Sequence, residues 1–176
     1  LGVSFGEQTV LEDVNMHIHC GSFNVIIGQN SAGKSTLIKA ILGEIPHTGT
    51  IEFKDTKDGH MAKLKIGYVP QKGVLFSGTI ASNLRFGKAD ASDEQIKKAA
   101  DIAQASEFIE TKNDRYESSI AQGGSNVSGG QKQRLAIARA IAKDPHIYVF
   151  DDSFSALDLK TDAALRKAVS YTHLRA

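Results

Sequence analysis

The stretch Gly28-Gln29-Asn30-Ser31-Ala32-Gly33-Lys34-Ser35-Thr36 decides what fold to expect from this chain of 176 residues. It matches the phosphate-loop pattern G-x-x-x-x-G-K-[ST] and directly follows an apolar segment at residues 23–27. In such a loop the glycines let backbone N–H groups turn toward the β- and γ-phosphates of a nucleotide. Lys34 adds a positive charge, and the Ser35 hydroxyl can ligate Mg²⁺ at the positive end of the following helix. The stretch predicts a nucleotide site on a strand-to-helix turn, with an ordinary glycine-rich turn as the alternative.

A second group of motifs lies further along the chain. Val127-Ser128-Gly129-Gly130-Gln131-Lys132-Gln133-Arg134 precedes an apolar run at residues 147–150 and then Asp151-Asp152-Ser153-Phe154-Ser155-Ala156-Leu157-Asp158. Together with the phosphate loop and Gln71, these segments resemble, in this order, the ATPase domain of ABC transporters over nearly the whole chain. The resemblance implies an α/β fold, a P-loop NTPase of the ABC type with a helical subdomain inserted in the α/β core. It also implies binding of ATP and Mg²⁺, with hydrolysis coupled to transport.

Composition fits a single domain. A chain of 176 residues, 41% of them hydrophobic, can bury a substantial core. By resemblance we expect one ABC ATPase domain over residues 1–169, with the core at about 1–76 and 143–169 and the helical subdomain at about 77–142. No apolar stretch reaches the roughly 18 to 20 residues of a membrane-spanning helix, and no signal segment precedes the domain pattern, so we expect no direct membrane insertion.

The net charge and the single cysteine limit which binding partners and which cellular compartment are expected. A formal net charge of +1 gives no electrostatic reason to expect nucleic acid as a partner. The lone Cys20 cannot form an internal disulfide or a cysteine metal cluster, so a reducing, cytoplasmic setting is expected.

Hydrophobic periodicity and capping residues predict the secondary structure. We expect strands at residues 3–5, 14–19, 23–27, 50–53, 66–69 and 147–150, the last of them buried. Helices are expected at residues 35–42, 79–84, 93–105, 129–142 and 160–169. Ser92 and Gln95 form a capping box, and Gly43 is expected to end the first helix.

Phosphoryl transfer to water requires a site that holds the phosphates, neutralises developing charge and places a water in line. Lys34 and Ser35 serve the first two tasks. Asp151 ends an apolar strand and, by resemblance, holds the Mg²⁺ shell. Gln71 resembles the Q-loop glutamine, whose oxygen reaches Mg²⁺ and the water while its loop contacts the membrane domain. A strand-capping aspartate and an ordinary loop glutamine are the alternatives.

Residues 128–131 resemble the ABC signature, in which a serine caps a helix and flexible glycines approach a phosphate. In the family that phosphate belongs to the opposite subunit, so two domains enclose two ATP molecules head to tail. The resemblance implies two partners, a second ABC ATPase domain in a homo- or heterodimer and a transmembrane permease domain or subunit. It places the chain at the cytoplasmic face of the cell membrane and assigns Asp158 to communication across the dimer.

Three further side chains have two interpretations each. Phe5 resembles the aromatic residue that stacks on adenine in the family, with core packing as the alternative. Arg134 and Arg139 on the signature helix are expected to face solvent, although they could support the dimer interface.

Asp152 departs from the family pattern. It stands where active ABC ATPases usually carry a glutamate that polarises the attacking water. Aspartate is one methylene shorter, and general-base catalysis contributes about 10² to 10⁴-fold, so slow hydrolysis is expected at this chain's own site. Residues 151–158 resemble the degenerate half of heterodimeric multidrug exporters. A weakly hydrolysing regulatory half is therefore one alternative, and a soluble ABC-class ATPase acting on DNA or ribosomes is another, which the near-neutral charge disfavours.

The two parts of the chain resemble different classes of ABC ATPase. Residues 1–70 resemble a metal-type importer ATPase, and residues 71–169 resemble a multidrug-exporter ATPase, which suggests a chimera joined near residues 69–72, with a genuine exporter half as the alternative. His173 lies too close in sequence to Asp151 and Asp152 to be the switch histidine of the family, so a C-terminal truncation is expected. Residues 170–176 form an atypical, artefact-like tail. The two parts point to different cargoes, so the sequence predicts neither the substrate nor the direction of transport.

Several histidines precede the helical segment. His17, His19, His47 and His60 include a pair on one face of an expected strand. A zinc site needs three or four convergent ligands, so these side chains are expected to be exposed rather than metal-bound.

Overall fold

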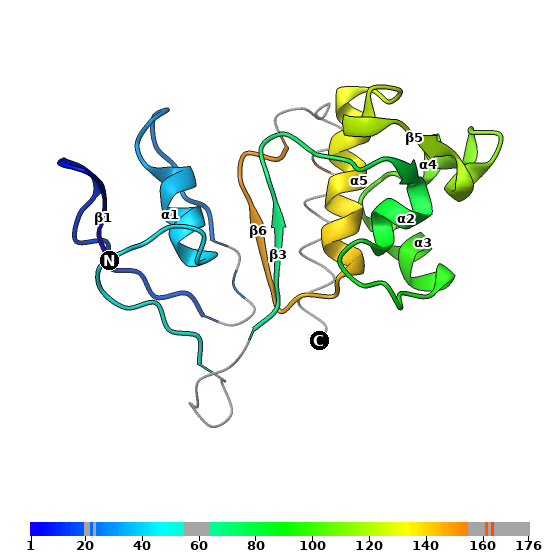
Figure 1. Cartoon of the computed structure of the whole chain (residues 1–176). Helices are drawn as coiled ribbons and strands as arrows, with labels where there is room; N and C mark the ends of the chain where they lie inside the picture. The colour runs from blue at the N-terminus through cyan, green and yellow to red at the C-terminus, as the bar shows by residue number, and fades with distance from the viewer. Residues whose placement is uncertain (20–21, 23, 55–63, 155–160, 162, 164–176) are drawn as a thin grey trace. The chain divides into compact units, whose positions relative to one another are not determined.

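The structure is a computed structural model that describes residues 1–19, 22, 24–54, 64–154, 161 and 163 (Figure 1). The chain forms two compact units, residues 1–64 and residues 65–176. Within the described residues, no helix combines the length and the apolar character that crossing a membrane requires.

The first unit pairs a small hairpin with one helix. Strand β1 (Val3–Phe5) runs antiparallel to β2 (Gln8–Leu11), and Gly6 adopts a left-handed φ of 60° in the turn between them. Helix α1 (Lys34–Ile41) packs against the hairpin and buries Leu37, Ile38 and Ala40. The sequence predicted β1 but gave no sign of β2.

Gly43 ends helix α1 as predicted. Its φ is 72°, its N–H donates to Ala40 O at 3.0 Å, and the Glu44 N–H donates to Lys39 O at 2.9 Å. These two bonds form a Schellman motif, which satisfies the last carbonyl groups of the helix and requires a residue that tolerates positive φ.

Three of the predicted strands are wrong within the described part of the first unit. The described residues of segments 14–19, 23–27 and 50–53 belong to no sheet. Ile18 and Val25 are 54% and 62% exposed, and Ile27, just before the phosphate loop, is 89% exposed. The physical reason is that a strand requires a ladder of hydrogen bonds to a neighbour, whereas apolar patterning reports only a capacity for burial.

The second unit is built on a parallel strand pair. Strand β3 (Ile66–Val69) pairs with β6 (Ile147–Phe150) in a continuous register from Ile66 opposite Ile147 to Val69 opposite Phe150. Both strands have the predicted bounds. The residues of β6 are half-buried rather than fully buried, because β3 is its one strand neighbour in the described part of the chain.

Four helices lie between the two strands in sequence, together with two single-turn 3₁₀ segments and a two-residue strand pair. They are α2 (Ile80–Arg85), α3 (Asp93–Ile102), α4 (Ser106–Glu110), η1 (Arg115–Glu117), η2 (Gln122–Gly124), α5 (Gly129–Ala142), β4 (Gly78–Thr79) and β5 (Ser119–Ile120).

Helices α3 and α5 show where local signals succeed and where they fail. Helix α5 has the predicted bounds, and α3 begins at the predicted capping box, in which the Gln95 N–H donates to Ser92 Oγ and the Ser92 N–H donates to Gln95 Oε1. The expected single helix at 93–105 is wrong, because Gln104 adopts a left-handed φ of 55° and separates α3 from α4.

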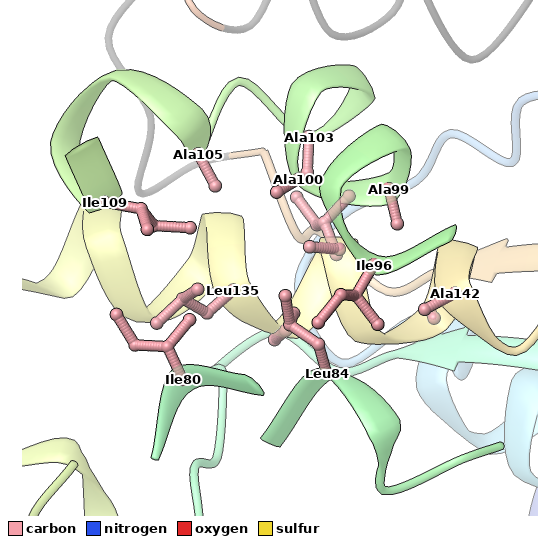
Figure 2. Close-up of a cluster of buried hydrophobic side chains, with 14 of the residues drawn as sticks. Ile80, Leu84, Ile96, Ala99, Ala100, Ala103, Ala105, Ile109, Leu135 and Ala142 are labelled. Atoms are coloured by element: carbon pink, nitrogen blue, oxygen red, sulfur yellow. The ribbon is translucent and has the colours of Figure 1, made fainter. Parts of the chain in front are cut away.

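A compact apolar core joins α2, α3 and α5 (Figure 2). Ile80 and Leu84 of α2, Ile96 of α3 and Leu135 of α5 are each at most 2% exposed. Burying a leucine or isoleucine stabilises a fold by about 1.5–3 kcal/mol. Small side chains allow the helices to approach closely. The small buried residues on α3 and directly after it are Ala99, Ala100, Ala103 and Ala105.

Candidate functional site

The phosphate loop ends at the N-terminus of α1. Gly33 is the N-cap of this helix, with φ 83° and ψ 8°, and Ser31 in the loop also has a positive φ of 67°. A Cβ atom at Gly33 would lie 2.7 Å from Leu11 Cδ2 and 3.3 Å from Val10 O of strand β2. Gly33 is therefore required both by its backbone angle and by its close contact with the hairpin.

Lys34 keeps its ammonium group at this loop. Its Nζ donates hydrogen bonds to Gly28 O at 2.7 Å and to Gln29 O at 2.6 Å. Among the described side chains none caps α1, and the first turn of the helix contains no acidic residue. The positive end of the helix dipole and the lysine charge thus act together, which suits an anionic ligand. Ser35 is exposed and Thr36 is half-buried at the start of the same helix.

Phe5 lies on β1 with 52% of its surface exposed. Its ring is therefore not part of the core, and the core-packing alternative fails.

The second unit brings three predicted site residues together where its parallel strands end. Gln71 follows β3, and Asp151 and Asp152 follow β6, so all three lie at the carboxyl edge of the strand pair. Gln71 Nε2 donates to Asp152 Oδ2 at 3.2 Å, and the Tyr68 hydroxyl donates to Asp151 Oδ2 at 3.5 Å. Ligands of open α/β sheets bind beyond this edge of the strands.

A buried serine holds the turn that carries the two aspartates. Ser153 is fully buried, and its Oγ donates to Val69 O at 2.6 Å. Asp152 has a left-handed φ of 48°, a conformation that aspartate adopts more readily than most residues. Backbone geometry of this kind persists only where surrounding contacts enforce it. Sequence reasoning missed Ser153, since no pattern showed that its hydroxyl would reach back to β3.

The signature segment has the predicted cap. Ser128 is the N-cap of α5, its Oγ accepts from the Gln131 N–H at 3.2 Å, and its own N–H donates to Gln131 Oε1 at 3.1 Å. A Cβ atom built at Gly129 would meet no described atom within 4 Å. Gly129, the first residue of α5, is thus not covered by the described part of the chain.

The two arginines of α5 correct the prediction that they face solvent. Both are half-buried: the Arg134 guanidinium lies 5.1 Å from the Phe108 ring centroid, and that of Arg139 lies 5.4 Å from the Phe76 centroid. Arg139 Nη2 also donates to Val74 O at 2.8 Å, and burial lowers the pKa of its guanidinium. The physical reason is that both guanidinium groups stack on aromatic rings.

Metal-ligand clusters are absent from the described residues, where no three His, Cys, Asp or Glu side chains converge on one point. The rings of His17 and His19 lie with their centroids 4.6 Å apart, and both residues are exposed, in line with the prediction. Cys20, His60 and Asp158 lie outside the described residues, as do the tail at 170–176 and nearly all of the expected helix at 160–169.

Comparison with known proteins identifies the family. The family model described as ABC transporter matches residues 11–155. An uncharacterized ABC transporter ATP-binding protein of Mycobacterium bovis is 41% identical over 91% of this chain and 28% of its own length. A β-(1→2)glucan export ATP-binding/permease protein of Rhizobium johnstonii is 37% identical over 95% of the chain and 30% of its own length. The mitochondrial iron-sulfur clusters transporter atm1 of Aspergillus fumigatus is 36% identical over 96% of the chain and 24% of its own length.

A solved structure agrees with these relatives. A bacterial Atm1-family ABC exporter with ATP bound superimposes with a TM-score of 0.84 and 29% identity, over 95% of this chain and 30% of the exporter chain. The chain thus spans less than a third of each of these proteins. The likeness covers both structural units and supports the P-loop NTPase fold that the motifs predicted. This chain belongs to the ABC transporter family and corresponds to its nucleotide-binding, ATP-binding domain.

Proposed function

We propose that the chain is the ATP-binding and ATP-hydrolysing part of an ABC transporter, which couples head-to-tail dimerisation around MgATP to transport across a membrane. One observation carries the proposal. The phosphate loop, with left-handed Gly33 and with Lys34 bound to its carbonyl groups, forms the N-terminus of α1, where backbone dipole and side chain both favour phosphate.

Within this proposal the first unit binds the nucleotide. The backbone of the phosphate loop and Lys34 contact the phosphates, and the exposed ring of Phe5 stacks on the adenine. The residues assigned to nucleotide binding are Phe5, Gly28, Gln29, Asn30, Ser31, Ala32, Gly33, Lys34, Ser35 and Thr36.

The chain offers ligands that fit Mg²⁺. By motif we assign Ser35, Gln71 and Asp151 as the residues that would hold the ion, because their hydroxyl, amide carbonyl and carboxylate groups supply the oxygen donors that Mg²⁺ prefers. When bound, Mg²⁺ neutralises charge on the phosphates. Asp152 would then polarise the attacking water while Gln71 orients it, and the hydrogen bond of 3.2 Å from Gln71 Nε2 to Asp152 Oδ2 supports a shared role of the two side chains.

The signature segment completes the site of a second ABC ATPase domain. Residues 128–131 at the start of α5 meet the ATP of the partner, and Asp158 takes part in communication between the subunits. The relatives named as export ATP-binding/permease proteins support a transmembrane permease as the other partner. We therefore place the chain at the cytoplasmic face of the membrane, with no role in nucleic-acid binding.

The proposal also includes the domain boundaries. One ABC ATPase domain occupies residues 1–169, with a helical subdomain at about 77–142. The junction near residues 69–72 stays a hypothesis. Exporter relatives align on both sides of it, which favours a genuine exporter half. A single long read of the source DNA across codons 60–80 tests this point.

The shorter side chain of Asp152 favours one specific variant of the function. The Asp152 side chain is one methylene shorter than that of glutamate, so its carboxylate lies further from the attacking water. ATP binding is then unaffected and hydrolysis is slower, as in a regulatory ATP-binding half. ATP binding without turnover in a competent dimer would support that variant.

MgATP binding itself is tested by thermal unfolding. At about 100 times its dissociation constant, a ligand stabilises the folded state by roughly 2.7 kcal/mol, which raises the Tm of a chain of this size by roughly 5–11 °C. The Lys34→Ala variant should lose this shift. Lys39→Ala is the matched control, because Lys39 lies exposed on the same helix and should keep it. An equal shift in wild type and Lys34→Ala, or none in either, would refute the proposed site.

A further inference from the structure

A buried glutamine of α5 holds the loop that carries Gln71. Gln133 is 1% exposed, its Oε1 accepts a hydrogen bond from the Gly73 N–H at 2.8 Å, and its Nε2 donates to Pro70 O at 3.1 Å. The two bonded backbone groups flank Gln71 on either side. One side chain therefore fixes both ends of the loop at residues 70–73.

The same loop approaches α5 too closely for any side chain larger than glycine at residue 73. A Cβ atom there would lie 2.9 Å from Lys132 O, 3.1 Å from Gln133 Oε1 and 3.2 Å from Ala136 Cβ. Cβ atoms in protein structures rarely make contacts this short. Because glycine has no Cβ atom, Gly73 allows the loop to lie against the helix.

The other side of the loop contacts the turn after β6. Ser153 Oγ donates to Val69 O at 2.6 Å and lies 3.3 Å from Pro70 O. The loop is thus held between α5 and the turn that bears Asp152. Because Gln133 uses both halves of its amide, any other loop position leaves a buried donor or acceptor unpaired, which is strongly disfavoured.

We propose that Gln133 is a positioning residue, which fixes the loop at 70–73 and thereby holds Gln71 Nε2 against Asp152 Oδ2. The proposal rests on the function above, in which Gln71 and Asp152 serve ATP hydrolysis. Gln133 lies two residues after Gln131, on the helix whose first turn is the signature segment. Helix α5 therefore connects the surface that meets the partner's ATP with the loop beside this chain's own Asp152. A movement of α5 on dimerisation carries the Gln71 loop with it.

The test compares two variants of buried amides. Gln133→Met keeps the length of the side chain and removes both hydrogen bonds to the loop. Asn83→Leu is the matched control: Asn83 is 2% exposed, and its amide bonds Phe76 N–H and Phe76 O, outside residues 70–73. Both variants should lower the Tm, so a purely structural role is present in each.

Two measurements then separate positioning from stability. The first is the NMR signal of the Gln71 side-chain amide in the full chain without nucleotide. The second is the single-turnover rate of ATP hydrolysis, with MgATP affinity determined separately. In Gln133→Met we expect the Gln71 signal to move toward that of a free glutamine. We also expect the rate to fall by up to about 100-fold, the effect of a misplacement near 1 Å, at unchanged affinity. Asn83→Leu should keep both the signal and the rate.

The outcomes decide between the alternatives. A Gln71 signal that is unchanged in Gln133→Met, or that moves equally in Asn83→Leu, overturns the proposal. Should Gln133→Met fail to fold, Gly73→Ala displaces the same loop from its other contact and should give the same two changes. A wild-type chain that binds no MgATP would refute the proposed function, whereas the Gln71 signal would still decide the role of Gln133.

Discussion

Replacing Gly33 by alanine should disrupt the phosphate loop through two separate effects. Gly33 has a φ of 83°, in a region that residues with a Cβ rarely adopt. The new Cβ would also lie 2.7 Å from Leu11 Cδ2, well inside the usual separation of about 3.5–4.0 Å for two carbon atoms. The substitution therefore strains both the backbone of the loop and its packing on strand β2.

The two effects have comparable magnitudes. A left-handed backbone costs an L-residue roughly 1–2 kcal/mol, and forcing extra volume into a packed contact typically costs about 1–3 kcal/mol. The sum is about 2–5 kcal/mol, against a total stability of about 5–15 kcal/mol for a typical protein. If the phosphate loop instead adopts another conformation that relieves the strain, the affinity for MgATP should fall at least tenfold, which corresponds to about 1.4 kcal/mol of binding free energy.

Urea denaturation of four proteins separates the two effects. Gly33→Ala, Leu11→Ala and the double variant form a cycle with the wild type, and removing the leucine side chain should relieve the contact but not the backbone strain. Gly28→Ala is the control, because its Cβ would lie 3.5 Å from Ala32 Cβ, an ordinary contact. A Gly33→Ala protein as stable as the wild type would refute the reasoning. Strict additivity in the cycle would refute the steric part alone.

Three further predictions concern the second unit. Asp152→Glu should speed single-turnover ATP hydrolysis in a competent dimer at least tenfold, which is part of the full contribution of about 10² to 10⁴-fold from general-base catalysis, and an unchanged rate would contradict the role given to this carboxyl. Ser128→Ala removes the cap of α5 and should lower the free energy of unfolding by about 1 kcal/mol in urea; a smaller loss than in Ser125→Ala, an exposed neighbour, would count against the capping box. Burial raises the pKa of Tyr148 to about 12, so stability should be unaffected below about pH 10 and fall from there to about pH 12, because the unfolded tyrosine ionises first. Tyr148→Phe should flatten this decline, as urea midpoints measured against pH will show.

Features set by neighbouring residues were predictable from the sequence. The start of α5 follows from the expected cap at Ser128, and its length follows from the apolar periodicity behind it. The end of α1 follows from Gly43, and β3 and β6 follow from short apolar runs. In the candidate site, Gln71, Asp151 and Asp152 were predicted by motif, and all three follow β3 and β6 at the carboxyl edge of this strand pair.

Features that depend on distant contacts were not predictable in this way. The strands expected at 14–19 and 23–27 had suitable patterning, but patterning does not supply a hydrogen-bonding neighbour. The break after α3 depends on the backbone angle of Gln104, a residue type that gives no local signal for a left-handed conformation. Gln133 and Ser153 bond to backbone atoms of β3 and the following loop that are 60 to 84 positions away, so their roles emerge only from the folded chain.

The pairing of β3 with β6 also sets the order in which the second unit is assembled. Gln71 and Asp152 are 81 positions apart, and all four helices α2–α5 are synthesised between them. Closing so long a segment costs chain entropy before the strand contacts offset it, and contacts of this kind slow folding. The edge of the sheet that bears Gln71 and Asp152 should therefore form late, after local helical contacts. A nascent chain has its phosphate loop complete long before Asp152 has been added, so nucleotide binding and hydrolytic competence should be acquired at different times.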